Sequence, residues 1–332
     1  MKFSRRQALA GGAVLALSVQ DALSPRDAQA QDVSAYPVRP VRILLGFAPG
    51  GGADIFGRAV AGRLNAMWGQ PVIIENRPGA SGMIAAEIVA KAAPDGYTLV
   101  LSVPNSHSLG PHLMKAPYDA VRDFTPITLG VSFPMICVVG NSIPVNTMQE
   151  LAAYAKANRG KLTYASTGIG SIQQIGGEVF NRFTDAQVTH VPYKGSAPAI
   201  VDVIAGNVTM SFDTSTGAMS HIKAGKLRAL GVLSANRIAS LPNVPTAAEV
   251  GFPGFELAAW YGFHGPPGMP KALVDRIQQD IARAMQMPEV KDRMLQAGAE
   301  ISGNRPEEFK TYFERDYERM GAVVKATGLK AE

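Results

Sequence analysis

The chain has 332 residues, of which 46% are hydrophobic and 18% are charged. This composition supplies enough apolar material for the cores of roughly two domains and carries too little charge for a disordered chain. A single cysteine excludes a disulfide framework and a metal site made of several thiolates. The net charge of +5 includes no basic cluster, so nothing indicates a nucleic-acid partner.

The start of the chain predicts an export signal. Lys2, Arg5 and Arg6 precede an apolar stretch at 8–19, which is too short to cross a bilayer. Small side chains follow, and we expect a signal peptidase to cut after Ala30. The paired arginines leave the general secretory (Sec) and twin-arginine (Tat) routes both open. No later apolar run is long enough to span a membrane, so a soluble exported protein is expected.

The remaining chain alternates strand-like and helix-like segments, which is typical of an α/β protein. In its first part the pattern predicts strands at 41–45, 72–74 and 97–103 and helices at 53–68 and 82–93. Its middle part predicts strands at 162–165, 188–191, 208–212 and 227–233 and helices at 147–158, 171–183 and 197–205. Three helices are predicted near the end, at 271–286, 288–297 and 306–326.

The absence of a low-complexity linker bears on how the domains are joined. Two domains would be connected by strands that cross between them, and 124–134 and 255–262 are the candidates. After the signal at 1–30, this predicts a discontinuous first domain made of 31–132 and 258–332. The second domain would be 133–257, with a ligand cleft between the two.

A glycine-rich turn at 46–54 follows the first predicted strand and opens a helix. Glycines allow a ligand to approach the backbone, and a helix start offers unpaired N–H groups and a partial positive charge. The turn therefore predicts an anion site, although it lacks the Gly-Lys-Ser/Thr ending of a nucleotide P-loop. Asp54 would contact the ligand or cap the helix. The candidate contacts are Phe47, Pro49, Gly50, Gly51 and Asp54.

A second turn, at 166–171, lies between a strand and a helix in the other predicted domain. It fails the dinucleotide fingerprint because Gln173 occupies the third glycine position. Its hydroxyl and N–H donors suit a carboxylate or another small oxyanion. Together, the two turns could hold the ends of one anion. The candidate contacts are Ser166, Thr167, Gly168, Gly170 and Ser171.

Further candidates lie outside these turns. Asp213 follows the predicted strand at 208–212, and strand ends line the ligand crevice of open α/β sheets, so Asp213 would contact the ligand or close a turn. Tyr193, with Phe47, would supply an apolar wall. Ser106 is included as a further ligand contact.

The sequence contains little that suggests catalysis. There is no zinc motif and no nucleophile elbow, and Cys137 lies in an apolar run that predicts a buried, inert thiol. Ser220 and Lys223 have the spacing of serine–lysine hydrolases, but the Lys-Thr-Gly-like triplet at 194–196 precedes them, which is the wrong order. A secreted two-lobed hydrolase that uses this pair is the competing hypothesis.

A series of motifs resembles the Bug family, the periplasmic TctC-like receptors of tripartite tricarboxylate transporters. The similarity covers nearly all of the chain after the signal. In order, the motifs are Tyr-Pro-Val-Arg-Pro-Val at 36–41, Phe-Ala-Pro-Gly-Gly-Gly-Ala-Asp at 47–54, Glu-Asn-Arg-Pro-Gly at 75–79, Pro-Asp-Gly-Tyr-Thr-Leu at 94–99, Asp-Phe-Thr-Pro at 123–126, Tyr-Ala-Ser-Thr-Gly at 164–168, His-Val-Pro-Tyr-Lys-Gly at 190–195, Gly-Lys-Leu-Arg-Ala-Leu at 225–230 and Leu-Pro-Asn-Val-Pro-Thr at 241–246.

This resemblance implies a type II-like periplasmic-binding-protein fold of two domains, each a mostly parallel sheet flanked by helices. It implies that 47–54 and 166–171 grip the carboxylate of one small organic acid, partly through backbone amides and bridging waters. The ligand would be a di- or tricarboxylate or an aromatic carboxylate. The implied partners are the large and small membrane subunits of a transporter, with no cofactor, metal or covalent chemistry. The receptor is expected to be a monomer.

Two positions depart from the family pattern. Gln174 stands where the family often has histidine, which keeps hydrogen bonding but removes a titratable group. His264 stands where a small or apolar residue is usual. Either change could alter ligand choice, and Gln174 is kept as a candidate contact. A sensor that serves a signalling partner stays open as an alternative to a transport receptor.

Overall fold

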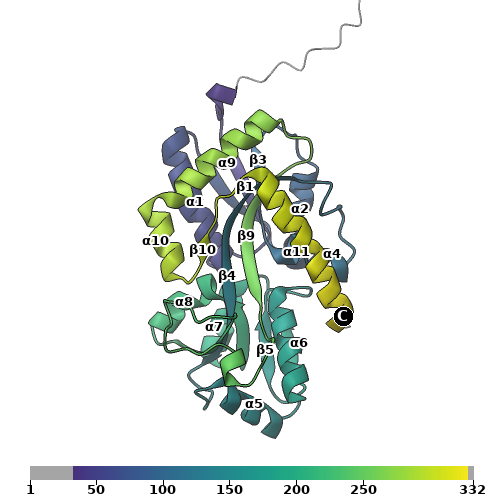
Figure 1. The fold of residues 1–332 in the computed structure, drawn as a ribbon, viewed down its shortest axis with the longest axis vertical. Helices are drawn as coiled ribbons and strands as arrows, with labels where there is room; N and C mark the ends of the chain where they lie inside the picture. The colour runs from purple at the N-terminus through teal and green to yellow at the C-terminus, as the bar shows by residue number, and fades with distance from the viewer. Residues whose placement is uncertain (1–32, 328–332) are drawn as a thin grey trace, which may run out of the picture.

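A computed structural model describes residues 33–327 of the chain. The predicted export signal at 1–30 lies outside the described residues. Within 33–327, no helix combines the length and the apolar character needed to span a bilayer. Figure 1 shows an elongated molecule with two halves, one above the other.

The first half is built around a parallel set of strands that was predicted nearly to the residue. Strand β1 pairs with β2 on one side and β3 on the other. Buried side chains alternate along β1: Ile43 and Leu45 face helices α1 and α9, whereas Leu44 faces α2 and α11 (Figure 1). Bounds are β1 Val41–Leu45, β2 Val72–Asn76, β3 Thr98–Ser102, α1 Gly52–Trp68, α2 Met83–Ala90, α9 Lys271–Gln286, α10 Pro288–Gln296 and α11 Pro306–Thr327.

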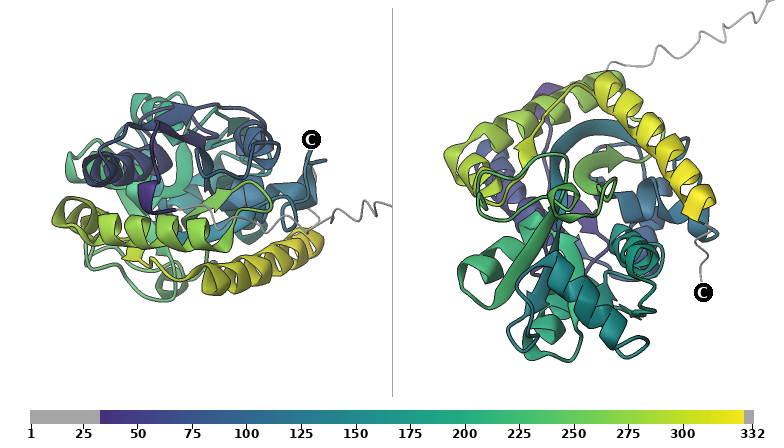
Figure 2. Two further views of the ribbon diagram at one scale, coloured as in Figure 1. Left: turned by 90° about the horizontal axis from the view of Figure 1, so that it is seen from above. Right: turned by 60° about the horizontal axis from the view of Figure 1, so that its bottom comes forward.

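The second half repeats this arrangement with other segments. Strand β5 pairs in parallel with β6 and β7, and helices α5 to α8 surround the strands (Figure 2). The strands are β5 Thr163–Ser166, β6 Thr189–Pro192, β7 Met210–Thr214 and β8 Leu227–Leu233, and the helices are α5 Met148–Ala157, α6 Ile172–Thr184, α7 Ser196–Ala205 and α8 Ser215–Lys223. Strand β7 begins and ends two residues later than predicted, so Asp213 lies inside it.

Two antiparallel strands, β4 (Thr125–Gly140) and β9 (Ala258–Gly265), connect the halves. They pair from Thr125 opposite Gly265 to Pro134 opposite Ala258. Beyond Pro134, β4 pairs with β7 and β8 instead, so this one strand belongs to both halves. The predicted crossing segments lie on these two strands, but β4 continues six residues past the expected end at residue 134. It does so because both of its edges find new partners.

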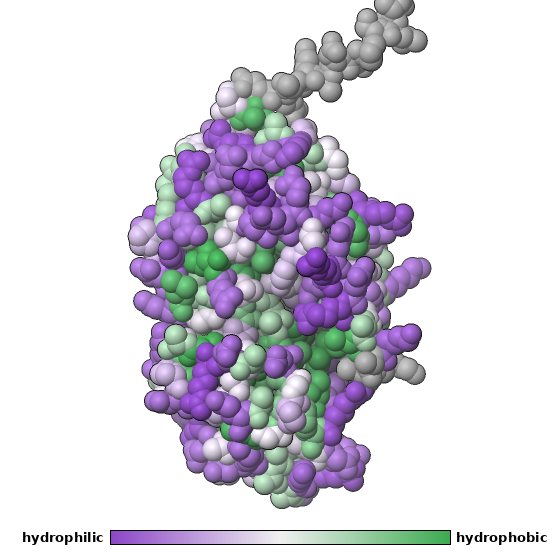
Figure 3. All heavy atoms as spheres, viewed as in Figure 1, coloured by the Kyte–Doolittle hydropathy of each residue, from purple (hydrophilic) through white to green (hydrophobic). Residues whose placement is uncertain are grey.

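The core follows the alternation of side chains along β4. Met135, Cys137 and Val139 pack with α5 and α6, whereas Ile136 and Val138 pack with α7 and α8. Cys137 is fully buried, and burial raises the pKa of its thiol, so it is inert as predicted. Hydrophilic side chains predominate around the outline of the face shown in Figure 3, and scattered apolar patches lie towards its middle.

Several short elements of the described residues were not predicted, among them α3 (Pro104–His107), α4 (Gly110–Leu113) and β10 (Glu300–Ile301). Helix α3 follows β3 directly and begins with a proline, whose missing N–H costs nothing at a helix start. Its single turn is too short to produce a helical period in the sequence. Its residue Asn105 nevertheless reaches the pocket described below.

Candidate ligand-binding site

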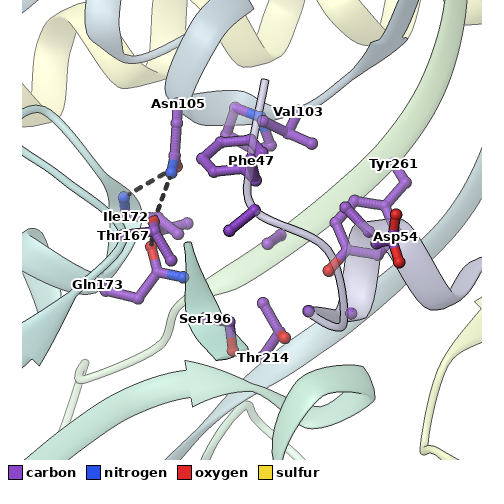
Figure 4. Close-up of a pocket in the computed structure, with 16 residues that line it drawn as sticks. Phe47, Asp54, Val103, Asn105, Thr167, Ile172, Gln173, Ser196, Thr214 and Tyr261 are labelled. Atoms are coloured by element: carbon purple, nitrogen blue, oxygen red, sulfur yellow. Dashed lines mark hydrogen bonds between the residues drawn. The ribbon is translucent and has the colours of Figure 1, made fainter. Parts of the chain in front are cut away.

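A pocket lies between the two halves, where helix starts from both of them converge (Figure 4). It contains about 440 Å³ of space between the atoms, including solvent at its mouth. Its lining comes from the first half, the second half and strand β9. The lining residues are Phe47, Ala48, Gly51, Gly52, Ala53, Asp54, Val103, Pro104, Asn105, Thr167, Ile172, Gln173, Ser196, Thr214, Ala259 and Tyr261.

Helix α1 brings its N-terminus to the pocket from the first half. The N–H groups of Gly52 and Ala53 have no hydrogen bond to any described residue, as expected for a first helical turn. The helix start lies so close to the second half that an added Cβ at Gly52 would clash with the hydroxyl of Thr216 and lie 3.0 Å from the backbone nitrogen of Gly217, both on α8. Glycine, which has no Cβ, is therefore the residue that fits at this position.

Three helices of the second half begin at the same pocket. Ile172 opens α6, Ser196 opens α7, and Thr214 is the N-cap of α8, accepting a hydrogen bond from the N–H of Gly217 at 3.0 Å. Four helix N-termini therefore surround one space, and each carries a partial positive charge. No lysine, arginine or histidine lines the pocket. This arrangement can bind an anion through backbone dipoles and neutral donors.

Asp54 is the charged residue of the lining, and its carboxylate is already paired. It accepts hydrogen bonds from Gly50 N at 3.0 Å, Arg58 Nε at 2.9 Å and Asn76 Nδ2 at 3.0 Å. Burial would raise the pKa of Asp54, but these donors outweigh it and hold the pKa below its usual value. Asp54 does not cap α1, because its carboxylate fastens the turn before the helix. Its contact with the ligand stays a prediction.

Asp213 supports the pocket from behind. It accepts hydrogen bonds from Ser196 Oγ at 2.7 Å and from Thr214 N at 2.6 Å, and thereby orients two lining residues. Burial raises the pKa of Asp213, and these bonds oppose that shift only in part. The residue is fully enclosed and is not part of the lining.

Most of the second predicted turn shapes the start of α6 instead of lining the pocket. Ser171 Oγ caps the helix by accepting from Gln174 N at 3.3 Å, and Gln174 Oε1 accepts from Gly170 N at 2.7 Å. Ser166 Oγ lies 2.5 Å from His190 Nε2 and accepts from Gly168 N at 3.1 Å. The N–H groups of Gly168 and Gly170 are therefore used within the protein.

The predicted contacts divide into three groups. Phe47, Gly51, Asp54 and Thr167 line the pocket. A neighbouring cavity, which is open to solvent, shares Phe47 and Thr167 and adds Gly168 and Tyr193, so Phe47 and Tyr193 form walls of that cavity. The predicted contacts that line neither space are Pro49, Gly50, Ser106, Ser166, Gly170, Ser171, Gln174 and Asp213.

Sequence reasoning missed several polar lining residues. Asn105 follows the third predicted strand, Ser196 precedes the helix predicted at 197–205, and Thr214 follows the strand that drew attention to Asp213. All three lie just beyond the carboxyl end of a strand, so the rule that selected Asp213 would have found them. Gln173 and Tyr261 carried no comparable signal.

The other residues of interest lie elsewhere. Ser220 is exposed on α8, and Lys223 Nζ donates to the carbonyl of Gln296 at 3.2 Å. Both line a different cavity, between α8 and α10. His264 is fully buried, with Nδ1 2.7 Å from Ser102 Oγ, and does not reach the pocket.

Residues 56–329 match the family model of the tripartite tricarboxylate transporter family receptor. The chain belongs to this family. The receptor is 34% identical to the protein BugT of Bordetella pertussis over 297 residues, which is 89% of this chain and 91% of BugT. It superposes on the periplasmic binding protein BugD with a TM-score of 0.86 at 34% identity, covering 90% of this chain and all of that one. These matches confirm the predicted family and the fold of a periplasmic binding protein.

Two further solved structures are described with a ligand. Rpa4515 of R. palustris, with adipate, has a TM-score of 0.85 at 33% identity and covers 89% of the receptor and 99% of its own chain. MatC from Rhodopseudomonas palustris, with bound malate, has a TM-score of 0.83 at 31% identity and covers 87% of the receptor and 100% of its own chain.

Proposed function

We propose that the receptor captures a small organic carboxylate in the periplasm and delivers it to the membrane subunits of a tripartite transporter. The convergence of four helix N-termini on a pocket without a cationic side chain carries this proposal. Burying a carboxylate is costly unless donors replace its water, and helix starts supply such donors together with a favourable dipole.

Two similar receptors bind adipate and malate, which are both dicarboxylates. Their resemblance to this receptor favours a ligand with more than one carboxyl group, and an aromatic acid is the other candidate. The pocket and the neighbouring cavity share Phe47 and Thr167, so a ligand with a second carboxyl group could extend from one space into the other.

Capture would proceed by closure of two domains. We retain the predicted division into 31–132 with 258–332 and 133–257, with β4 and β9 as the connecting strands. Hinge closure would bring α1 of one domain towards α6, α7 and α8 of the other and enclose the anion. Only binding is required of the pocket residues, so the ligand is released unaltered.

A thermal-shift screen of residues 31–332 against mono-, di- and tricarboxylates, aliphatic and aromatic, tests this function. A ligand at a hundred times its Kd should add about 2.7 kcal/mol to the free energy of unfolding and raise Tm. Calorimetry then measures Kd, and NMR of the recovered ligand should show no chemical change.

Two variants accompany the screen. Gly51→Val should weaken binding at least tenfold, because a larger side chain would fill space between α1 and Ser196, whose Cβ lies 3.4 Å from the ideal Cβ position at Gly51. Ser220→Ala should bind as the native protein does, since Ser220 lies away from the pocket. Conversion of the ligand, or a folded protein that no carboxylate stabilises, would contradict the proposal.

A further inference from the structure

We propose that Asn105 couples ligand capture to closure by bridging the two halves across the pocket. Asn105 lies on α3 in the first half, and its side chain reaches the start of α6 in the second half (Figure 4). Its Oδ1 accepts a hydrogen bond from Ile172 N at 3.1 Å, and its Nδ2 donates to Thr167 Oγ1 at 2.9 Å. One amide thus satisfies a donor and an acceptor that both belong to the opposite half.

The bridge continues into the second half. Thr167 Oγ1 donates in turn to Gln173 Oε1 at 2.9 Å. Asn105, Thr167 and Gln173 are each less than 10% exposed, and all three line the pocket. Because buried polar groups are costly to leave unpaired, separation of the halves without entry of water would be opposed by the whole chain of bonds.

Two other bonds that cross between the halves are of a different kind. Ala48 N donates to the carbonyl of Lys194 at 2.8 Å, and Ser81 Oγ donates to the carbonyl of Ile169. Each of these contributes one bond to a backbone oxygen. Asn105 bonds to a donor and to an acceptor of the opposite half at the same time. It does so on the wall of the pocket, where a bound ligand can contact it.

Helix α3 holds the Asn105 amide in place from behind. The neighbouring Ser106 accepts a hydrogen bond from the Tyr118 hydroxyl at its carbonyl oxygen, at 2.5 Å, and its Oγ lies 2.8 Å from His107 Nδ1. His107 is fully buried and stacks on His264 with ring centroids 5.1 Å apart. The amide is therefore presented by a fixed support, as expected of a positioning residue.

The chemistry of the amide explains how one residue serves both purposes. A primary amide has two N–H groups, and Thr167 uses one of them, which leaves the second for a ligand in the pocket. The bonds to Ile172 and Thr167 exist only when the halves are together. Asn105 therefore shifts the equilibrium towards the closed form, and a ligand that favours that form binds more tightly.

The test compares Asn105→Ala, Thr167→Val and Asn105→Asp with native protein, using small-angle scattering for closure and calorimetry for Kd. Asn105→Ala and Thr167→Val should both be more open and should bind the best carboxylate of the screen roughly tenfold more weakly, as expected for one or two lost hydrogen bonds. Asn207→Ala, which removes an exposed asparagine amide, should match native protein in both measurements.

Asn105→Asp separates closure from binding. Its carboxylate can still accept from Ile172 N at the positive end of α6, and the Thr167 hydroxyl can turn to donate to it, so closure should be retained. It adds a negative charge to the anion pocket, however, and carboxylate binding should fall by far more than in Asn105→Ala.

The calorimetric part of this test rests on the proposed function, because it needs a carboxylate that binds. Scattering tests the bridge in protein without ligand. If Asn105→Ala changes only Tm, and its scattering and Kd match those of native protein, the proposed bridge is wrong. The proposed function is not affected by that result. If no carboxylate binds native protein, the proposed function fails and scattering alone decides the bridge.

Discussion

The carboxylates of Asp54 and Asp213, at and behind the pocket wall, are both buried and hydrogen-bonded within the protein. Both carboxylates are buried, but donors from Arg58, Gly50 and Asn76 lower the pKa of Asp54, whereas burial raises the pKa of Asp213. Neither is left as a free negative charge facing the space between the helix starts. Both carboxylates accept hydrogen bonds from groups in or beside the pocket wall and so help to hold those groups in position.

The buried pair of His107 and His264 leads to a prediction about how the stability of the protein depends on pH. Burial lowers the pKa of His107 to about 3, and burial together with the neighbouring His107 lowers the pKa of His264. In the unfolded chain both titrate near 6.5. The unfolded state therefore binds more protons below pH 6.5, and the stability present above that pH is lost as the pH falls.

We expect the free energy of unfolding to fall between pH 6.5 and 5 with a slope that approaches about 1.4 kcal/mol per pH unit for each histidine. Urea unfolding at pH 7.5, 6.5, 5.5 and 5.0 measures it. His264→Phe places an apolar ring among Phe309 and Phe313. Because it removes one titrating group, it should reduce the slope by about 1.4 kcal/mol per pH unit. A flat profile between pH 7 and 5 would contradict a neutral buried pair.

At the scale of elements, the pocket depends on where helices begin. Helix α1 carries three glycines, and the first and last of them have different surroundings. Gly52, at its first position, lies against Thr216 of the second half and against Tyr261 on β9, whereas nothing lies within 4 Å of the Cβ position at Gly62. Gly52 therefore sets how closely the helix start approaches the second half, and Gly62 has no packing role.

We predict opposite effects of alanine at these two positions. Gly52→Ala should push the start of α1 away from Tyr261 and weaken carboxylate binding at least tenfold, which calorimetry measures. Gly62→Ala, the matched control, should leave Kd unchanged and stabilise the receptor by about 0.5–1 kcal/mol, because alanine favours a helix interior. Equal Kd values for both variants would show that the α1 start does not contact the ligand.

At the scale of the whole molecule, β4 pairs with strands of both halves, and we expect the halves to unfold together. Cys137 lies in the part of β4 that pairs with both β7 and β8, opposite Phe212 and Gly231. It is fully buried, so a thiol reagent reaches it only when the sheet opens. As the one cysteine of the sequence, it reports on the unfolding of the molecule as a whole.

We therefore expect Cys137 to react with a thiol reagent at a rate set by global unfolding. A carboxylate at a hundred times its Kd should slow labelling roughly a hundredfold, because it stabilises only the folded receptor. Labelling in 6 M urea serves as the control for full reactivity. Native protein that reacts as fast as unfolded protein would contradict the buried position.

The amino-acid sequence by itself determined the regular elements and the family. Periodicity predicted β1 and α9 to the residue, and Thr147 caps α5 as predicted, although Glu150 reaches back to the N–H of Asn146 instead of Thr147. The ordered motifs identified the receptor family that the family model confirms. These properties are local, because they depend on residues a few positions apart.

Only the tertiary structure decided which polar groups face the pocket. Asn105 meets Thr167 and Ile172 across 62 and 67 positions of sequence, and that meeting depends on how β4 and β9 join the halves. It also decided that Ser171 and Gln174 close their own turn and that Gly52 lies against Thr216. A local pattern can place a donor at a helix start, but the approach of the opposite half determines whether protein or ligand uses it.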